Sequence, residues 1–313
     1  MPSLRPDQVL CLLIATAICL TLPAPVRETF TVQTLAAPPI YESQQEIPFP
    51  KENSAPTPDI SANGVIIFEP YSGSILYSKN ADQSIPLASL TKLMTALVAL
   101  ETFQLDQELT VQTENTIEGN RMKLVSGEKI LVRDLLAGLL IFSGNDAAMT
   151  LANNDPNGYS NFLEKMNSTA RKLGMNQTSF ENPTGLDSEN QFSSAHDIAI
   201  LTKEILLQPE IARILGEQMR EVKSTDGQFT HTLYTTNELL GKIAGLTLGK
   251  TGSTLLAGEC LMTVVERNEK KLVTVVMGSQ ARFDDTQVLI DWAYENFTWT
   301  TPDLLEYNKE DII

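Results

Sequence analysis

A helical segment that carries a single lysine in apolar surroundings constrains this chain more than any other feature. Residues 86–100 read PLASLTKLMTALVAL, and the apolar residues at 90, 93, 94, 97 and 98 follow helical spacing. The opposite side carries Ala96 and Ala99 in place of charges, and a helix that is apolar nearly all round is a buried helix. Lys92 is the only charged residue of the segment, so the sequence predicts a lysine inside the core.

The residue that gives this lysine a chemical meaning is Ser89. It lies three residues before Lys92, so both side chains project from one face of the helix, one turn apart. Burial of an ammonium lowers its pKa and favours the neutral amine. A neutral lysine beside a serine hydroxyl is a general base beside a nucleophile. The spacing alone is common on solvated helix faces, and the apolar surroundings are what favour a catalytic pair here.

Composition limits the chemistry that the rest of the chain can supply. The chain has 313 residues, 42% of them hydrophobic, enough for one large domain or two smaller ones with a sizeable core. Its formal net charge of −16 argues against nucleic acid as a partner and against broad attraction to anionic lipid. The cysteines are Cys11, Cys19 and Cys260 and the histidines are His196 and His231. These are too few for a disulfide framework or a cysteine metal site, and they argue against zinc.

The N-terminal part differs in composition from the body. Residues 9–22 are apolar apart from two threonines, a length that is short for a membrane span and typical of a signal-peptide core. We therefore predict a signal peptide or N-terminal membrane anchor at 1–25, and either one places the body outside the cytoplasm, in the cell envelope. Residues 26–58 are rich in Pro, Glu, Gln and Ser and predict a disordered linker. We expect the folded domain at 59–297 and an acidic tail at 298–313.

The order of expected elements in the folded domain indicates its fold class. Two short runs rich in β-formers, 64–68 and 74–78, flank turn residues and predict a hairpin. Residues 101–210 are mostly helical in pattern, and a second hairpin is expected from 261–266 and 271–278. A last helix is expected at 284–297. Strands, helices, strands and a helix predict an α+β fold, an antiparallel sheet flanked by helices with a helical insertion.

Two further motifs carry polar groups at positions suited to a cleft. Ser143-Gly144-Asn145 interrupts two apolar helical stretches, which places a hydroxyl and a carboxamide at a break between buried helices. Lys250-Thr251-Gly252-Ser253 follows Gly249, and the two glycines of this strand-like piece allow its backbone to approach a ligand closely. Taken alone, the first is better explained as an ordinary helix cap, and the second can be a lysine in a surface turn.

Together and in this order, the three motifs resemble the Ser-x-x-Lys, Ser-x-Asn and Lys-Thr-Gly set of penicillin-binding proteins and serine β-lactamases. The resemblance is closest to the low-molecular-mass penicillin-binding proteins, the serine-type D-alanyl-D-alanine carboxypeptidases of peptidase family S11, and it covers roughly residues 59–297. The segments that carry it are Pro86 to Thr95, Ser143 to Ala148, Asn182 to Leu186, Lys250 to Thr254 and Ala257 to Leu261. It implies a β-lactamase/transpeptidase-like fold and hydrolysis of a peptide bond between two D-alanines.

The resemblance also implies roles for the catalytic residues. Ser89 attacks the carbonyl between the last two D-alanines of a peptidoglycan stem peptide, and Lys92 is the general base. Ser143 relays a proton to the leaving amine. Water then hydrolyses the acyl-enzyme, and neither a metal nor an organic cofactor is required. β-Lactam antibiotics are the acylating inhibitors that such a site implies.

Substrate binding falls to the residues of the other two motifs. By resemblance, Asn145 holds the substrate backbone, Lys250 positions charge near Ser143, and Thr251 binds the terminal carboxylate. The backbone N–H of Ser253 forms the oxyanion hole together with that of the nucleophile. Many members of the family carry a larger residue at the position of Ser253, so the substrate preference stays open.

Two alternatives compete with a carboxypeptidase. A class A-like serine β-lactamase shares the three motifs, but those enzymes have Asp where this chain has Gly144, and no separate deacylating glutamate stands out in the sequence. A non-catalytic penicillin-binding scaffold or sensor is the other, although every motif residue is present. Many relatives have a further β-rich domain and a C-terminal amphipathic anchor, whereas only 16 residues follow Phe297. If a membrane holds this protein, we expect the N-terminal segment to do so.

Overall fold

The computed structural model describes residues 46–51, 55–112 and 117–300. The predicted signal or anchor segment, much of the predicted linker and most of the predicted tail lie outside these ranges. Within them, no helix is both long and apolar enough to cross a membrane.

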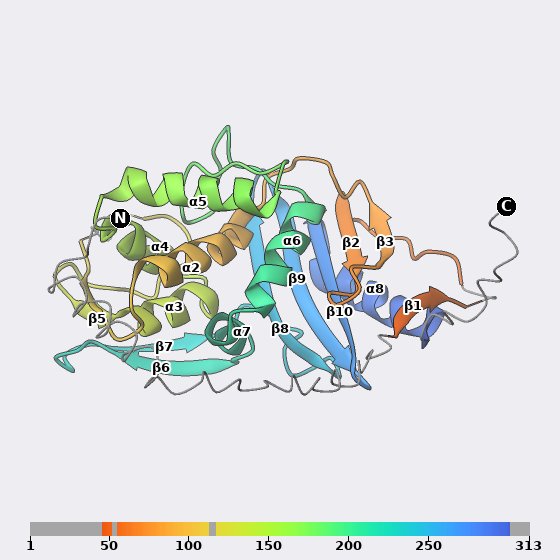
Figure 1. Cartoon of the computed structure of the whole chain (residues 1–313). Coiled ribbons are helices and arrows are strands. Elements are labelled where there is room, and N and C mark those ends of the chain that lie inside the picture. The colour runs from red at the N-terminus through yellow and green to blue at the C-terminus, as the bar shows by residue number, and fades with distance from the viewer. Residues whose placement is uncertain (1–45, 52–54, 113–116, 301–313) are drawn as a thin grey trace, which may run out of the picture. The chain divides into compact units, whose positions relative to one another are not determined.

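A five-stranded sheet in the order β3-β2-β10-β9-β8 is the framework of the folded body, and all neighbouring strands are antiparallel (Figure 1). The strands are β2 (Gly64–Phe68), β3 (Ile75–Lys79), β8 (Leu246–Thr254), β9 (Gly258–Arg267) and β10 (Lys270–Ser279). Both predicted hairpins are confirmed, β2 with β3 and β9 with β10. Asn268 and Glu269 form the β9–β10 turn with φ of 50° and 63°, the backbone that a two-residue type I′ turn requires.

Helices cover both faces of this sheet, because the strands alternate apolar side chains between two cores. In β2, Ile66 and Phe68 pack in one core with α6 (Ala195–Leu206). Val65 and Ile67 point to the other face and pack with α8 (Arg282–Asn296). The predicted α+β class with an antiparallel sheet is therefore confirmed.

The chain between β3 and β8 contains the predicted helical insertion and two small two-stranded sheets. The described residues between Phe103 and Leu131 contain no helix, so the expectation of mostly helical structure from 101 onward is wrong for this stretch. The elements between β3 and β8 are η1 (Ala88–Leu90), α2 (Thr91–Thr102), β4 (Glu108–Thr110), β5 (Lys129–Leu131), α3 (Val132–Leu140), α4 (Asn145–Asn153), α5 (Tyr159–Leu173), α6, α7 (Pro209–Leu215), β6 (Met219–Lys223) and β7 (Thr230–Tyr234). Helix α2 contacts α3, α4, α5 and α6, and Figure 1 shows it between α3 and α5. Every residue from Thr91 to Ala99 is buried, as the apolar pattern predicts.

Two short strands lie where the sequence predicts a linker and a tail. β1 (Ile47–Pro50) pairs antiparallel with β11 (Phe297–Thr300). The expected boundaries at 58 and 298 therefore differ from the structure at these strands. Aromatic contacts hold the start of β11 against the folded body. Trp292 of α8 contacts Phe297 edge to face, with ring centroids 5.7 Å apart, and contacts Tyr77 in the same way at 5.8 Å. Pro48 and Pro50 disfavour a strand in the sequence pattern and so conceal this pairing.

Candidate active site

The predicted nucleophile and base meet where η1 passes into α2. The Ser89 Oγ lies 2.8 Å from the Lys92 Nζ, which also donates to the carbonyl oxygen of Thr184. The Thr91 hydroxyl donates to the Ala88 carbonyl at 2.8 Å and so closes the turn before the helix. Ala88 has a φ of +47°, a left-handed conformation that is uncommon for alanine and is held here by the surrounding contacts.

The environment of Lys92 favours the neutral amine. Its side chain is fully buried, and burial is the main reason why its pKa lies well below the ordinary value of 10.5. The positive charge of Lys250 lowers this pKa further, whereas the carboxylate of Asp146 acts in the opposite direction. A neutral amine has a lone pair that can accept the hydroxyl proton of Ser89. The predicted direction of the pKa shift is confirmed.

A second lysine–serine pair belongs to the same pocket. The Lys250 Nζ donates to the Ser143 Oγ and to the Thr251 carbonyl oxygen, both at 2.8 Å. Burial lowers the pKa of Lys250 to about 7, with a further contribution from the nearby Arg282. Ser143 lies at the break between α3 and α4. Its φ of +63° takes the backbone out of the helical conformation at this residue.

Strand β8 brings the third motif against the nucleophile. It is the last strand of the sheet, so its outer edge is not paired within the sheet. A Cβ on Gly252 would lie 2.9 Å from the Ser89 backbone nitrogen and 3.0 Å from the Cβ of Ala88, so only glycine allows this close approach. The close approach at this position is to the nucleophile turn, and the predicted approach of this backbone to a ligand stays a prediction.

One pocket collects most of the predicted residues. Ser89, Ser143, Asn145, Thr251 and Ser253 line it, and Lys92 and Lys250 lie buried behind the two serines. The remaining lining residues are Gly119, Asn120, Thr184, Gly185, Leu186, Thr236, Gly252, Thr254 and Arg282. None of these described lining residues is an aspartate or glutamate. The structure thus brings three motifs that are far apart in the sequence to a single site.

Several residues of this site could not be singled out from the sequence. Arg282 donates from Nη1 to the Gly252 carbonyl at 2.9 Å and places a second positive charge beside Lys250. The Thr236 hydroxyl lies 2.5 Å from that of Thr251. Both residues come from segments without a motif, so spacing in the sequence carries no signal for them. Only the fold places them at the pocket.

The cysteine and the histidines of the body lie outside this pocket. Cys260 is buried in β9, and burial raises the pKa of its thiol to about 11, which disfavours a nucleophilic thiolate. His196 pairs with Asp82 on the surface, and His231 pairs with the buried Glu128. Among the described residues, no group of three or more His, Cys, Asp or Glu side chains is placed to hold a metal ion.

An antiparallel sheet with helices on both faces, and two buried lysines each bonded to a serine in one pocket, define a serine acyl-enzyme hydrolase of the penicillin-binding class. The sequence agrees at the level of the family. Residues 51–281 match the sequence model of peptidase family S11, D-alanyl-D-alanine carboxypeptidase, and the chain belongs to this family.

Individual relatives support the assignment. The chain is 33% identical over 263 residues to the D-alanyl-D-alanine carboxypeptidase DacF of Bacillus subtilis, covering 80% of this chain and 67% of that protein. It is 34% identical over 267 residues to a D-alanyl-D-alanine endopeptidase of Escherichia coli, covering 82% and 85%. Among solved structures, a D-alanyl-D-alanine carboxypeptidase of Mycobacterium tuberculosis superposes with a TM-score of 0.73 at 31% identity, covering 79% and 95%. The DD-transpeptidase of Streptomyces K15 gives a TM-score of 0.72 at 28% identity, covering 77% and 100%.

Proposed function

We propose that this chain is a serine-type D-alanyl-D-alanine carboxypeptidase that removes the terminal D-alanine of peptidoglycan stem peptides through an acyl-enzyme on Ser89. The observation that carries the proposal is the 2.8 Å contact between the Ser89 hydroxyl and Lys92, a fully buried lysine whose pKa lies well below its ordinary value. The names of the relatives supply the D-alanyl-D-alanine chemistry.

Acylation follows from the two lysine–serine pairs. Lys92 accepts the proton of Ser89 as the Oγ bonds to the scissile carbonyl carbon. The backbone N–H groups of Ser89 and Ser253 stabilise the oxyanion, and losing one such donor typically costs about 3–4 kcal/mol of transition-state stabilisation. When the C–N bond breaks, Ser143 relays to the leaving amine the proton that Ser89 gave up to Lys92, and Lys250, which donates to Ser143 at 2.8 Å, keeps its charge. Terminal D-alanine leaves, and water then hydrolyses the ester.

Substrate binding uses the free edge of β8. An extended peptide can add to an unpaired strand edge through main-chain hydrogen bonds. The carboxylate of the last residue is placed at Thr251, where Lys250 and Arg282 supply positive charge. Asn145 also lines the pocket and holds the substrate backbone. Recognition of this C-terminal carboxylate directs cleavage to the last peptide bond, which is the specificity of a carboxypeptidase.

The cell envelope is the proposed location, with the segment at 1–25 as signal peptide or membrane anchor, as its apolar pattern suggests. Peptidoglycan stem peptides are the proposed partners, and β-lactams are expected to acylate Ser89. A class A-like β-lactamase would need a deacylating carboxylate. The absence of aspartate and glutamate among the described pocket residues therefore favours a long-lived acyl-enzyme.

The decisive experiment follows labelling with a fluorescent penicillin and release of D-alanine from a pentapeptide stem. Wild type should form a stable labelled adduct and release D-alanine, and Ser89→Ala should do neither. Ser84→Ala, which alters an exposed serine bonded to Gln177, is the matched control and should behave as wild type. No labelling of the intact protein would overturn the acyl-enzyme, and rapid turnover of the penicillin would favour the β-lactamase.

A further inference from the structure

One wall of the pocket is a segment without regular structure, residues 118–124, which we call the wall segment. Its residues Gly119 and Asn120 line the pocket. Asn145 holds its first half: the Asn145 backbone N–H donates to the Asn120 carbonyl at 2.7 Å, and its side-chain Nδ2 donates to the Glu118 carbonyl at 2.6 Å. The position of the wall segment and that of the Asn145 carboxamide are therefore linked.

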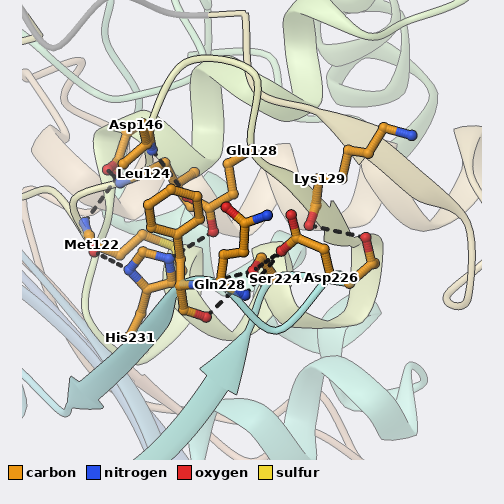
Figure 2. A network of polar contacts seen from close by, with 12 residues as sticks. Met122, Leu124, Glu128, Lys129, Asp146, Ser224, Asp226, Gln228 and His231 are labelled. Carbon is orange, nitrogen blue, oxygen red and sulfur yellow. Dashed lines mark hydrogen bonds and ion pairs between the residues drawn. The ribbon is translucent and has the colours of Figure 1, made fainter.

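The second half of the wall segment is held by Asp146. The buried carboxylate of Asp146 accepts from the backbone N–H of Met122 at 3.0 Å and from that of Leu124 at 3.1 Å (Figure 2). Asp146 follows Asn145 directly in α4, so both halves are attached to the first turn of the same helix.

A histidine from another element completes the attachment. His231 of β7 points its Nδ1 at the Met122 carbonyl oxygen, 2.9 Å away, and its Nε2 at the Glu128 Oε1, 2.7 Å away (Figure 2). Glu128 accepts the Val125 backbone N–H with its other oxygen at 2.9 Å. His231 and Glu128 are 8% and 3% exposed, so water cannot readily replace these contacts.

The two contacts of the imidazole also fix its orientation. A carbonyl oxygen only accepts, so Nδ1 must carry the proton that it donates to Met122. The Glu128 carboxyl, 2.7 Å from Nε2, holds the ring in the orientation in which Nδ1 faces Met122.

We propose that His231 and Glu128 are a positioning pair that sets the wall segment, and through it Asn145, for acylation of Ser89. Neither residue lines the pocket, so their effect on substrate passes through the Met122 carbonyl. The inference rests on the proposed function, because acylation is the step that it modulates. The hydrogen bond to Met122 is the contact that matters for rate, and the contact to Glu128 orients the ring.

Two substitutions separate these contacts. In His231→Asn, the amide nitrogen takes the place of Nδ1 and keeps the bond to Met122. In His231→Gln, the amide nitrogen takes the place of Nε2 and keeps the bond to Glu128. The second-order rate constant for acylation by a fluorescent penicillin should fall about tenfold to a hundredfold in His231→Gln, as for a small misplacement of a binding group. It should stay within about threefold of wild type in His231→Asn.

Thermal unfolding of each variant separates positioning from plain destabilisation. Tyr294→Phe removes a part-buried hydroxyl of α8 that lies 2.7 Å from the Lys270 carbonyl oxygen and 3.0 Å from that of Val265, away from the pocket, and it should lower stability without slowing acylation. His196→Gln, at the surface histidine paired with Asp82, should change neither quantity. Equal rates in His231→Asn and His231→Gln, or rates that simply follow stability, would overturn the proposal.

Glu128→Gln tests the pair if the histidine variants do not fold. Its amide can donate to Nε2 of a neutral imidazole and still accept from Val125, so the bond to Met122 persists, and acylation should stay within about threefold of wild type. A loss of tenfold or more in a folded Glu128→Gln protein would contradict the proposed order of importance. A wild type that is not labelled at all would instead refute the proposed function.

Discussion

Two buried lysines of this site differ in chemistry because their neighbours differ. Lys92 contacts one hydroxyl and one carbonyl, and it lies close enough to Lys250 for the second charge to lower its pKa. Lys250 also contacts a hydroxyl and a carbonyl, but it has Arg282 as its charged neighbour. A base needs a free lone pair and an anion-binding group needs a proton, so catalysis requires a pH range in which Lys92 is neutral while Lys250 is still charged.

The first prediction concerns the pH dependence of acylation. Protonated Lys92 cannot accept the proton of Ser89, so the rate should fall as the pH drops through the pKa of Lys92 in the folded protein. Because that pKa lies well below 10.5, the rising limb of the profile should lie well below the pH at which an ordinary lysine titrates. Stopped-flow acylation of wild type by a penicillin across the neutral and alkaline pH range measures it. A rate that rises only with the titration of an ordinary lysine, near pH 10.5, would show that burial does not lower the pKa of Lys92.

The residues of the site divide by how far they could be predicted from the sequence. Ser89 and Lys92 share one helical turn, so spacing and an apolar setting are enough to pair them. Arg282, Thr236 and His231 reach their positions only through sheet topology and packing, and no local pattern marks them. The predicted roles of Asn145 and Thr251 stay predictions, although both residues line the pocket.

At the scale of elements, the nucleophile turn depends on a tight loop that follows α5. Asn182 organises this loop: its Oδ1 accepts from the backbone N–H groups of Thr184 and Gly185 at 3.1 and 2.8 Å. The loop is fixed to α2 by the Thr95 hydroxyl, which donates to the Pro183 carbonyl at 2.7 Å. Gly185 has a φ of +87°, and its α-carbon faces the backbone of η1.

The second prediction is that Gly185→Ala displaces this turn. A Cβ there would lie 2.0 Å from the Ala88 carbonyl oxygen and 2.9 Å from the Ser89 nitrogen, so backbone has to move. Left-handed strain and overpacking together should lower the free energy of unfolding by about 2–4 kcal/mol, and acylation should slow by at least about a hundredfold.

Gly174→Ala is the matched control for that substitution. Gly174 ends α5 with a φ of +79°, and a Cβ there meets nothing within 4 Å. Its cost should be the conformational strain alone, about 1–2 kcal/mol, with acylation unchanged. Urea unfolding and penicillin labelling measure both quantities. Equal effects of the two alanines would mean that contact with η1 is unimportant.

The elements themselves were predictable to the extent that their patterns are local. The hairpins and the buried helix follow from alternation and helical spacing, and the structure confirms them. The β1–β11 pair joins residues about 250 positions apart in the sequence, as in the register Ile47 with Thr300. Such pairing depends on the aromatic contacts of Trp292 and Phe297, which exist only once α8 is in place.

At the scale of the whole molecule, the site is built at the expense of stability. Two fully buried lysines must give up hydration, and Ala88 and Ser143 adopt positive φ. Substitutions that remove strained or desolvated groups from an active site commonly stabilise the protein and reduce its activity. The global unfolding equilibrium should therefore carry a signature of the active site.

The last prediction gives this signature as a pH dependence of unfolding. In the unfolded chain Lys250 titrates near 10.5, and in the folded protein its pKa is about 7. Between these values the unfolded state binds more protons, so the free energy of unfolding should rise with pH across this window, by up to about 1.4 kcal/mol per pH unit for one group. Lys250→Met should reduce the slope, whereas Lys242→Met, at an exposed lysine, should leave it unchanged. Urea unfolding at pH 7, 8 and 9 measures the slopes, and parallel curves for wild type and Lys250→Met would show that burial does not hold Lys250 below its ordinary pKa.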